Sequence, residues 1–218
     1  QEAFVTDYQG RALWVEAELA LDRDGNFLAL RSSNLSNVGA HTVSFVPLNK
    51  GVQLMPTVYN VPAIHVRARA AMSNTPPTIP FRSAGRPEVI FVVERLVDIA
   101  AREHGFDPVA LRRRNLVPPE AFPHPNGLGI TSDSGDYPQV MATALALGDW
   151  AGFPARRAAA RGPGKRRGIG IGCYVEATSG MPRERAEIAV LPEGRVDLIL
   201  GTMASGQGHE TEFPQLVA

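Results

Sequence analysis

Cysteine, long apolar runs and net charge are what this 218-residue sequence lacks or nearly lacks. Its single cysteine, Cys173, excludes an internal disulfide and any metal cluster built only from cysteines of this chain. Cys173 lies in an apolar run, which predicts a buried structural thiol. No segment approaches the roughly 20 apolar residues of a membrane-spanning helix, and no signal-peptide pattern opens the sequence. We therefore expect a cytoplasmic protein.

Charge of either sign is not in excess, because 22 Lys and Arg residues balance 22 Asp and Glu residues. This balance argues against nucleic acid or an anionic membrane as a partner. The basic segment 156–167 contains no aromatic residue on which bases could stack, so it predicts a solvated linker or a subunit contact. The run Arg112, Arg113 and Arg114 predicts a charged helix face in the same way.

Apolar spacing and turn residues predict strands and helices that interleave without strict alternation. This pattern favours an α+β fold with mixed sheets and packed helices over a doubly wound sheet. The segment 34–54 is expected to be less regular, because Gly39, Pro47 and Gly51 would break any long element there. The expected strands are 13–21, 27–31, 61–70, 168–177, 184–191 and 195–200, and the expected helices are 87–104, 107–116 and 137–147.

A glycine-rich loop, 201–211, follows the last of these strands. Gly206 and Gly208 bracket Gln207, and glycines allow close approach of the backbone to a ligand. Such a loop can aim main-chain N–H groups at an anionic or oxo-bearing ligand, and the Gln207 amide both donates and accepts hydrogen bonds. A surface turn rich in small residues would carry the same pattern, so both interpretations stand at this point.

A second loop precedes the helix that begins near Pro87. Proline is favoured in the first helical turn, and Glu88 suits the positive end of the helix dipole. Arg82 and Arg86 are therefore expected in a loop between an extended segment and a helix, where binding residues are common. The alternative for Arg82 is an ion pair with a carboxylate across the loop.

The segment PFRSAGRPE, 80–88, resembles the active-site loop of the molybdenum hydroxylases, and GTMASGQGHET, 201–211, resembles their pterin-cofactor loop. ALRRRNL and GIGIGCYVEATSG match in order between them. This family includes xanthine dehydrogenase, aldehyde oxidoreductase and the large subunit of carbon monoxide dehydrogenase. The resemblance implies an internal fragment of a two-lobed molybdopterin-binding subunit. Residues 1–117 would be part of the first lobe, 118–167 a loop, helix and basic linker, and 168–218 the start of the second lobe.

The resemblance also implies roles for individual residues. Arg82 would help to position substrate or cofactor, with Phe81 as an apolar wall and Ser83 beside them as the third catalytic-loop residue. No residue is implied as a metal ligand. The implied cofactor-binding residues are Ser205, Gly206, Gln207, Gly208 and Thr211.

Three further residues invite a role by their positions. Lys50 stands about where purine-oxidising relatives have an arginine, but a solvated lysine is the stronger interpretation. Glu176 would lie near the substrate funnel or be an exposed carboxylate at a strand end. His209 has no second ligand for zinc nearby, and the resemblance suggests contact with the pterin phosphate.

The residue at position 83 bears on the substrate. Copper-containing carbon monoxide dehydrogenases resemble this loop but have a cysteine at the matching position, because a thiolate is a soft ligand for Cu(I). The serine hydroxyl is hard, so Ser83 argues against carbon monoxide as a substrate. The phenylalanine that xanthine-type enzymes carry nearby is also missing, which argues against a purine. The substrate class that the resemblance implies is an aldehyde or an N-heterocycle.

The activity implied by the family is hydroxylation with water-derived oxygen on molybdenum held by molybdopterin, in its cytosine dinucleotide form. Electrons would pass to an iron–sulfur small subunit and an FAD-binding medium subunit, in a dimer of heterotrimers. The family's catalytic glutamate has no counterpart in this sequence, so the fragment alone is expected to be inactive. The alternative is a non-catalytic scaffold or assembly module that keeps the fold.

Overall fold

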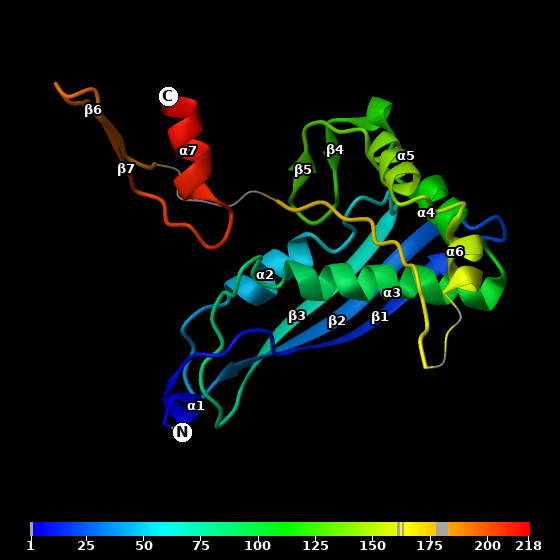
Figure 1. Cartoon of the computed structure of the whole chain (residues 1–218). Coiled ribbons are helices and arrows are strands. Elements are labelled where there is room, and N and C mark those ends of the chain that lie inside the picture. Colours follow the sequence, from blue (N-terminus) through cyan, green and yellow to red (C-terminus); the bar gives the residue numbers. More distant parts are fainter. Residues whose placement is uncertain (1, 161, 163, 178–182) are drawn as a thin grey trace. The chain divides into compact units, whose positions relative to one another are not determined.

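The computed structural model describes residues 2–160, 162, 164–177 and 183–218. The chain folds as two compact units, Gln1–Glu176 and Ala177–Ala218. The first unit holds a three-stranded sheet with helices packed on it, and the second holds a hairpin and a helix (Figure 1). Arg161 of the predicted basic segment lies outside the described residues, as do residues 178–182.

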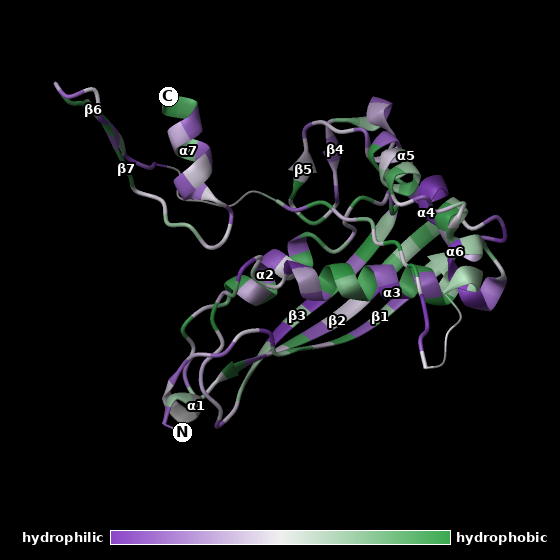
Figure 2. Cartoon of the chain, in the orientation of Figure 1, coloured by the Kyte–Doolittle hydropathy of each residue, from purple (hydrophilic) through white to green (hydrophobic). Residues whose placement is uncertain are grey.

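The sheet of the first unit is mixed, in the order β1 (Leu13–Leu21), β2 (Phe27–Gly39), β3 (Ala63–Met72). β1 and β2 are antiparallel and β2 and β3 are parallel. The turn between β1 and β2 forms as predicted, because the Asp22 carboxylate accepts hydrogen bonds from the backbone N–H groups of Asp24 and Asn26. The side chains of β1 alternate between half-buried and exposed, and Figure 2 shows both hydrophobic and hydrophilic stretches along the strands. The predicted α+β class with mixed sheets is confirmed.

The helices α3 (Arg86–His104) and α2 (Val46–Gln53) cover one face of this sheet (Figure 1). α3 buries Val89, Val93 and Val97 completely or nearly so, and these pack with Phe27 and Leu30 of β2. The long apolar stripe of the sequence is therefore the face of α3 that builds the core.

Local signals set the ends of the predicted helices. α3 has Pro87 in its first turn and ends at Gly105, whose φ of 74° is left-handed. α4 (Pro108–Asn115) begins at Asp107, whose carboxylate accepts two backbone N–H groups. α5 (Tyr137–Leu147) begins after Asp136, whose carboxylate accepts one backbone N–H, that of Gln139. These helices are confirmed.

One expectation about regular structure was only partly right, and another was wrong. The segment 34–54 is irregular only over 40–45: β2 continues to Gly39, where it ends, and Pro47 lies in the first turn of the short helix α2, where the missing N–H costs nothing. The expected strand 168–177 pairs with no other strand. Its alternating residues Ile171, Cys173 and Val175 instead pack on the core of the first unit.

Short elements complete the first unit. The start of the expected basic linker is helical, as α6. Among the described residues, no helix is long and apolar enough to cross a membrane. The short elements are α1 (Ala3–Thr6), η1 (Pro119–Ala121), β4 (His124–Pro125), β5 (Thr131–Ser132) and α6 (Phe153–Ala159).

The second unit pairs β6 (Ala186–Val190) with β7 (Val196–Leu200) in an antiparallel hairpin, which confirms the two predicted strands. The glycine-rich loop follows, and α7 (His209–Val217) begins directly after it. Our sequence reasoning did not predict α7. Pro214 inside the helix and the glycines before it conceal its pattern.

Candidate functional site

The loop 81–85 has an unusual backbone. Ser83, Ala84 and Gly85 take φ angles of 71°, 42° and 89°, so three successive residues are left-handed. The Ala84 N–H donates to the Phe81 carbonyl at 2.6 Å, and the Arg86 N–H donates to the Ser83 carbonyl at 3.1 Å. Left-handed residues other than glycine cost about 1–3 kcal/mol each, persist only where the surroundings hold them, and cluster at functional sites.

One support of this loop is the backbone of α2. A Cβ added to Gly85 would lie 1.7 Å from the carbonyl oxygen of Pro47. A Cβ added to Gly51 would lie 2.7 Å from the carbonyl oxygen of Gly85. The loop and α2 therefore meet backbone to backbone, at two positions where only glycine fits.

The other support is Arg11, just before β1. Its Nη1 donates to Oε2 of Glu88 at 2.8 Å, and its Nη2 donates to the carbonyl oxygen of Arg82 at 2.8 Å. The guanidinium lies 5.2 Å from the centroid of the Phe81 ring. Our sequence reasoning missed Arg11. The only local signal is a basic residue after a glycine, and its partners lie 71 and 77 residues away.

The three residues predicted to form the catalytic loop share this single turn. The Phe81 side chain is 62% exposed, Arg82 is exposed and Ser83 is half-buried. Arg86, expected in the loop, instead begins α3 and is buried. It forms an ion pair with Glu176. Neither a place near the substrate funnel nor an exposed carboxylate at a strand end, the two interpretations of Glu176, included this pairing. Glu176 follows no strand, and its carboxylate ties the end of the first unit to α3.

A buried polar network lies beneath α3. The Tyr59 hydroxyl donates to Oε1 of Glu94 at 2.5 Å. Arg112 donates from Nε to Oε2 of Glu94 at 2.9 Å and from Nη2 to Asp98 at 2.8 Å. The prediction of a charged helix face was wrong for Arg112, which is fully buried, because α4 turns this residue toward α3. Arg113 and Arg114 are exposed as predicted.

Burial and neighbouring charge shift the pKa values in this network. Burial raises the pKa of Tyr59, and the charge of Glu94 raises it further. Burial acts to lower the pKa of Arg112, but the charge of Glu94 and the hydrogen bond to Asp98 outweigh burial and raise it. Burial, followed by the charge of Glu94, raises the pKa of Cys173 to about 11. This thiol is half-buried rather than buried, and it is protonated at neutral pH, as suits a structural thiol.

The glycine-rich loop of the second unit has its own ordered geometry. Gly206 and Gly208 are left-handed, with φ angles of 96° and 85°. The Ser205 N–H donates to Oε1 of Gln207, so the carbonyl end of this exposed amide is fixed by its own loop. The Gly208 carbonyl accepts hydrogen bonds from the N–H groups of Thr211 and Glu212, and these two bonds form the first turn of α7.

His209, the first residue of α7, has its ring centroid 4.7 Å from that of Phe213, with the two rings tilted by 52°. Its Nδ1 is buried and has no hydrogen-bond partner among the described residues. In the part of the chain that the structure describes, no group of three His, Cys, Asp or Glu side chains could hold a metal ion. Lys50 is exposed in the last turn of α2, as expected for a solvated lysine.

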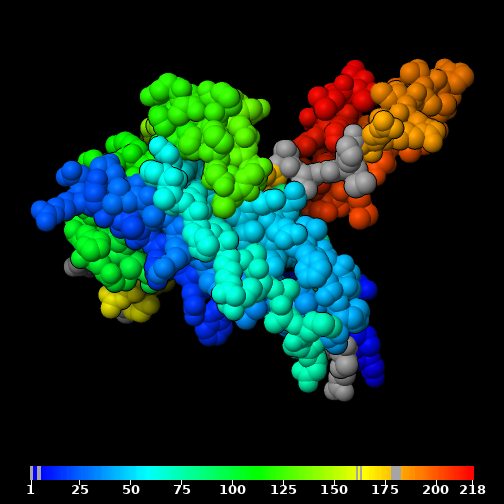
Figure 3. Space-filling view, turned by 180° about the vertical axis from the view of Figure 1, so that it is seen from behind, coloured from blue at the N-terminus to red at the C-terminus, as the bar shows by residue number. Residues whose placement is uncertain are grey.

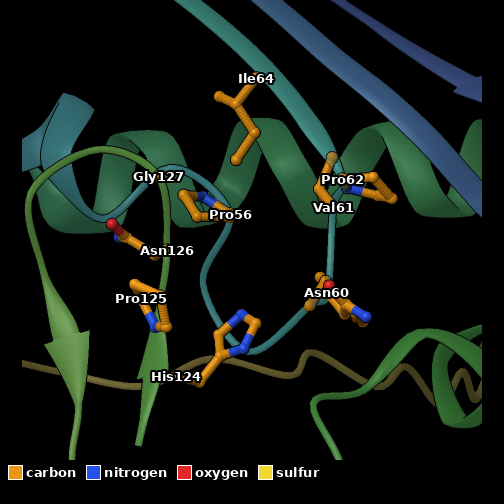
Figure 4. A pocket seen from close by; sticks show the side chains of 10 residues that line it. Pro56, Asn60, Val61, Pro62, Ile64, His124, Pro125, Asn126 and Gly127 are labelled. Atoms are coloured by element: carbon orange, nitrogen blue, oxygen red, sulfur yellow. The ribbon is translucent and has the colours of Figure 1, made fainter. Parts of the chain in front are cut away.

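Two cavities of the first unit differ in how they lie relative to the predicted site residues. One, of about 380 Å³, lies between the segment 56–64 and the β4–β5 turn. Figure 4 shows its lining, in which prolines and aliphatic side chains alternate with the polar side chains of Asn60, His124 and Asn126. No predicted site residue lines it. The other, of about 480 Å³, lies between β1 and the start of α3, and Arg11 and Glu88 line it beside the loop 81–85.

Two families match the chain, both described as "Molybdopterin cofactor-binding domain". One matches residues 1–116 and the other residues 143–218. Together they take in both predicted loops, 81–85 in the first and 201–211 in the second.

Known proteins match over nearly the whole chain. The carbon monoxide dehydrogenase large chain of Hydrogenophaga pseudoflava is 28% identical over 99% of this chain and 29% of its own length. Subunit gamma of the 6-hydroxypseudooxynicotine dehydrogenase complex of Paenarthrobacter nicotinovorans is 30% identical over 100% of this chain and 28% of its length. The crystal structure of quinoline 2-oxidoreductase from Pseudomonas putida 86 superposes with a TM-score of 0.81, at 29% identity, over 100% of this chain and 30% of that one.

The chain thus spans less than a third of the length of these relatives. The family matches in the N-terminal and the C-terminal part of the chain confirm the resemblance that the two loops indicate. This chain belongs to the molybdopterin cofactor-binding domains of the molybdenum hydroxylase family.

Proposed function

We propose that this chain supplies part of the catalytic large subunit of a molybdenum hydroxylase. The reaction would place water-derived oxygen on an aldehyde or an N-heterocycle. The observation that carries the proposal is the strained loop 81–85, held by α2 on one side and by Arg11 on the other. Strained residues such as Ser83 and Ala84 persist only where their surroundings hold them, and such residues cluster at functional sites.

On this proposal, the loop faces the substrate. Phe81 offers an exposed ring and Arg82 a planar cation, which together suit a flat substrate that carries a polar group. Ser83 offers a hydroxyl where a soft thiolate would be needed to hold Cu(I). We therefore propose that carbon monoxide is not the substrate. The quinoline in the name of one similar enzyme agrees with an N-heterocycle.

The glycine-rich loop fits a cofactor that presents acceptor atoms. The fixed Gln207 carbonyl leaves its NH₂ group as a donor, and the left-handed glycines bring backbone close to a ligand. His209 adds a buried nitrogen without a partner among the described residues. Molybdopterin, when bound, supplies the redox and oxygen-transfer chemistry. The residues that would hold it are Ser205, Gly206, Gln207, Gly208 and Thr211.

Several finer features belong to the same proposal. The cofactor would be the cytosine dinucleotide form, and the partners would be an iron–sulfur small subunit and an FAD-binding medium subunit. The assembly would be a cytoplasmic dimer of heterotrimers. No general base is assigned to this chain, so the fragment alone is expected to be inactive.

The test uses the complete large subunit, purified with its partner subunits. Molybdenum is measured by mass spectrometry and pterin by fluorescence in the wild type, in Gln207→Ala, and in Gln215→Ala as a matched control on α7. We expect stoichiometric molybdenum and pterin in the wild type and the control, and a loss of both in Gln207→Ala. Aldehydes and N-heterocycles are then screened in ¹⁸O-labelled water for label in the product.

A well-folded wild-type complex without molybdenum and pterin would contradict the proposal. That result would favour the alternative, a scaffold or assembly module that keeps the fold without the chemistry. Loaded enzyme that oxidises carbon monoxide but no aldehyde or N-heterocycle would overturn the substrate assignment alone.

A further inference from the structure

We propose that Arg11 is a positioning residue for the loop 81–85, and that its guanidinium sets the orientation of the residues that face the substrate. The inference rests on the proposed function of this loop. It is carried by three contacts of one side chain, to Phe81, Arg82 and Glu88.

The contacts of Arg11 span both ends of the loop. One nitrogen binds the Arg82 carbonyl at the start of the turn, and the other binds Glu88 in the first turn of α3. Glu88 is only 17% exposed and Arg11 is 34% exposed, so this ion pair is better shielded from water than a surface pair. The rigid fork of a guanidinium makes both bonds at once and stacks on a ring, which a lysine ammonium does not do.

The bond to the Arg82 carbonyl has a direct structural consequence. This carbonyl belongs to the peptide group that joins Arg82 to Ser83, and a peptide group is planar. Fixing its oxygen therefore fixes the direction of the Ser83 N–H and limits the rotation that would relieve the left-handed backbone at Ser83. Contacts from outside the loop thus act together with the hydrogen bonds within it to hold the strained conformation.

Arg11 is itself held in place. Gln9 is paired with the segment that leads into the loop: its N–H donates to the Pro77 carbonyl at 3.0 Å, and its carbonyl accepts from Ile79 at 2.9 Å. A Cβ on Gly10 would lie 3.0 Å from Cβ of Phe81, so the backbone before Arg11 contacts the loop directly. Figure 3 shows the N-terminal residues at the same end of the first unit as those that follow β3.

The loop is consequently held from two sides by different means. On one side the backbone of α2 contacts Gly85 and excludes any side chain there. On the other side Arg11 fixes Phe81 and the Arg82 carbonyl. Removing Arg11 frees the first half of the turn and leaves the second half packed, so local misplacement is expected rather than unfolding.

The experiment compares Arg11→Ala and Arg11→Lys with the wild type in the complete subunit with its partners. Arg31→Ala is the matched control, because it removes an Arg–Glu pair whose side chains are 66% and 68% exposed and lie away from the loop. Trypsin cleavage of the Arg82–Ser83 bond is followed by mass spectrometry, which reports on the loop without any turnover. Molybdenum content, thermal midpoint, kcat and KM are measured on the same samples.

We expect Arg11→Ala to be cut at Arg82–Ser83 at least about tenfold faster than the wild type, with molybdenum content and thermal midpoint nearly unchanged. A misplacement of about 1 Å costs roughly 100-fold in rate, so kcat/KM should fall by about that factor, mainly through kcat. Arg11→Lys should recover part of both effects, and Arg31→Ala should match the wild type.

Cleavage and kcat/KM within twofold of the wild type in Arg11→Ala would overturn the inference. If that variant does not fold, Arg11→Lys decides by the same two measurements: wild-type values overturn the inference, and intermediate values support it. A wild type without molybdenum or turnover defeats the proposed function instead. The cleavage rates then still decide whether Arg11 holds the loop.

Discussion

Replacing Gly85 by alanine should be far more damaging than the same replacement at the left-handed Gly105. Gly85 has a φ of 89°, and a Cβ there would lie 1.7 Å from the Pro47 carbonyl oxygen and 2.6 Å from its carbon. These atoms are backbone, so no side-chain rotation relieves the overlap. Either α2 or the loop 81–85 must move.

The size of the effect follows from two separate terms. A left-handed backbone costs an L-residue other than glycine roughly 1–2 kcal/mol. Forcing extra volume into a packed contact costs about 1–3 kcal/mol more. Gly85→Ala should therefore destabilise the region of α2 and the loop by about 2–5 kcal/mol.

Two other glycines separate these terms. Gly105 is left-handed with a φ of 74°, but a Cβ there would meet nothing within 4 Å, so Gly105→Ala should cost only the first term. Gly51 meets the Gly85 carbonyl oxygen at 2.7 Å from within α2. Gly51→Ala should therefore lose stability through this close contact and regain about 1 kcal/mol because alanine has the better helix propensity.

Hydrogen exchange with mass spectrometry on the complete subunit measures the local effect. Peptides that cover 46–55 and 83–93 should exchange faster in Gly85→Ala than in the wild type, while those around Gly105 should change little. The reasoning would be refuted by a Gly85→Ala variant that exchanges no faster in these peptides than Gly105→Ala does. It would also be refuted by equal thermal midpoints for the two variants.

Three further predictions concern the first unit. Arg112→Leu leaves the Glu94 carboxylate without its buried partner and should lower the free energy of unfolding by about 3–5 kcal/mol. Denaturant unfolding measures this loss. The control Arg113→Leu replaces an exposed neighbour and should lower the same free energy by less than about 0.5 kcal/mol. Since the pKa of Cys173 is raised from 9.0 to about 11, its thiol is protonated at pH 8. Iodoacetamide should label it about 100-fold more slowly than an unshifted thiol, speeding up as pH rises toward 11; rapid labelling at pH 7 would contradict this. Asp107→Ala removes the N-cap carboxylate of α4, which accepts hydrogen bonds from two backbone N–H groups. In the same unfolding assay this variant should be about 1 kcal/mol less stable than the wild type.

Elements whose signals are local could be predicted from the sequence. Asp107 caps its helix through residues two and three positions away, and the turn at Asp22 closes within four residues. Pro87 and Gly105 mark the two ends of α3 by their own backbone preferences. Such signals act before any tertiary contact forms, so they can be recognised without the fold.

The errors arose where tertiary contacts outweighed local preference. Pro47 and Gly51 suggested an irregular segment, but Pro47 needs no N–H in the first turn of α2, and Gly51 is required by the close approach of Gly85. The alternating residues around Cys173 resembled a strand, yet they pack on a core instead of pairing. Arg112 resembled a solvated charge, yet Glu94 and Asp98 compensate its burial.

The sequence by itself determined the ends of α3, α4 and α5, the alternation along β1 and the two loops that carry the family resemblance, because each depends on neighbouring residues. Placing Phe81, Arg82 and Ser83 in one turn needed only their order. Tertiary structure alone decided what holds that turn: Arg11 from 71 residues away and the backbone of α2 at Gly85. Contacts between residues so far apart leave no periodic trace in the sequence, since their distance depends on the whole path of the chain between them.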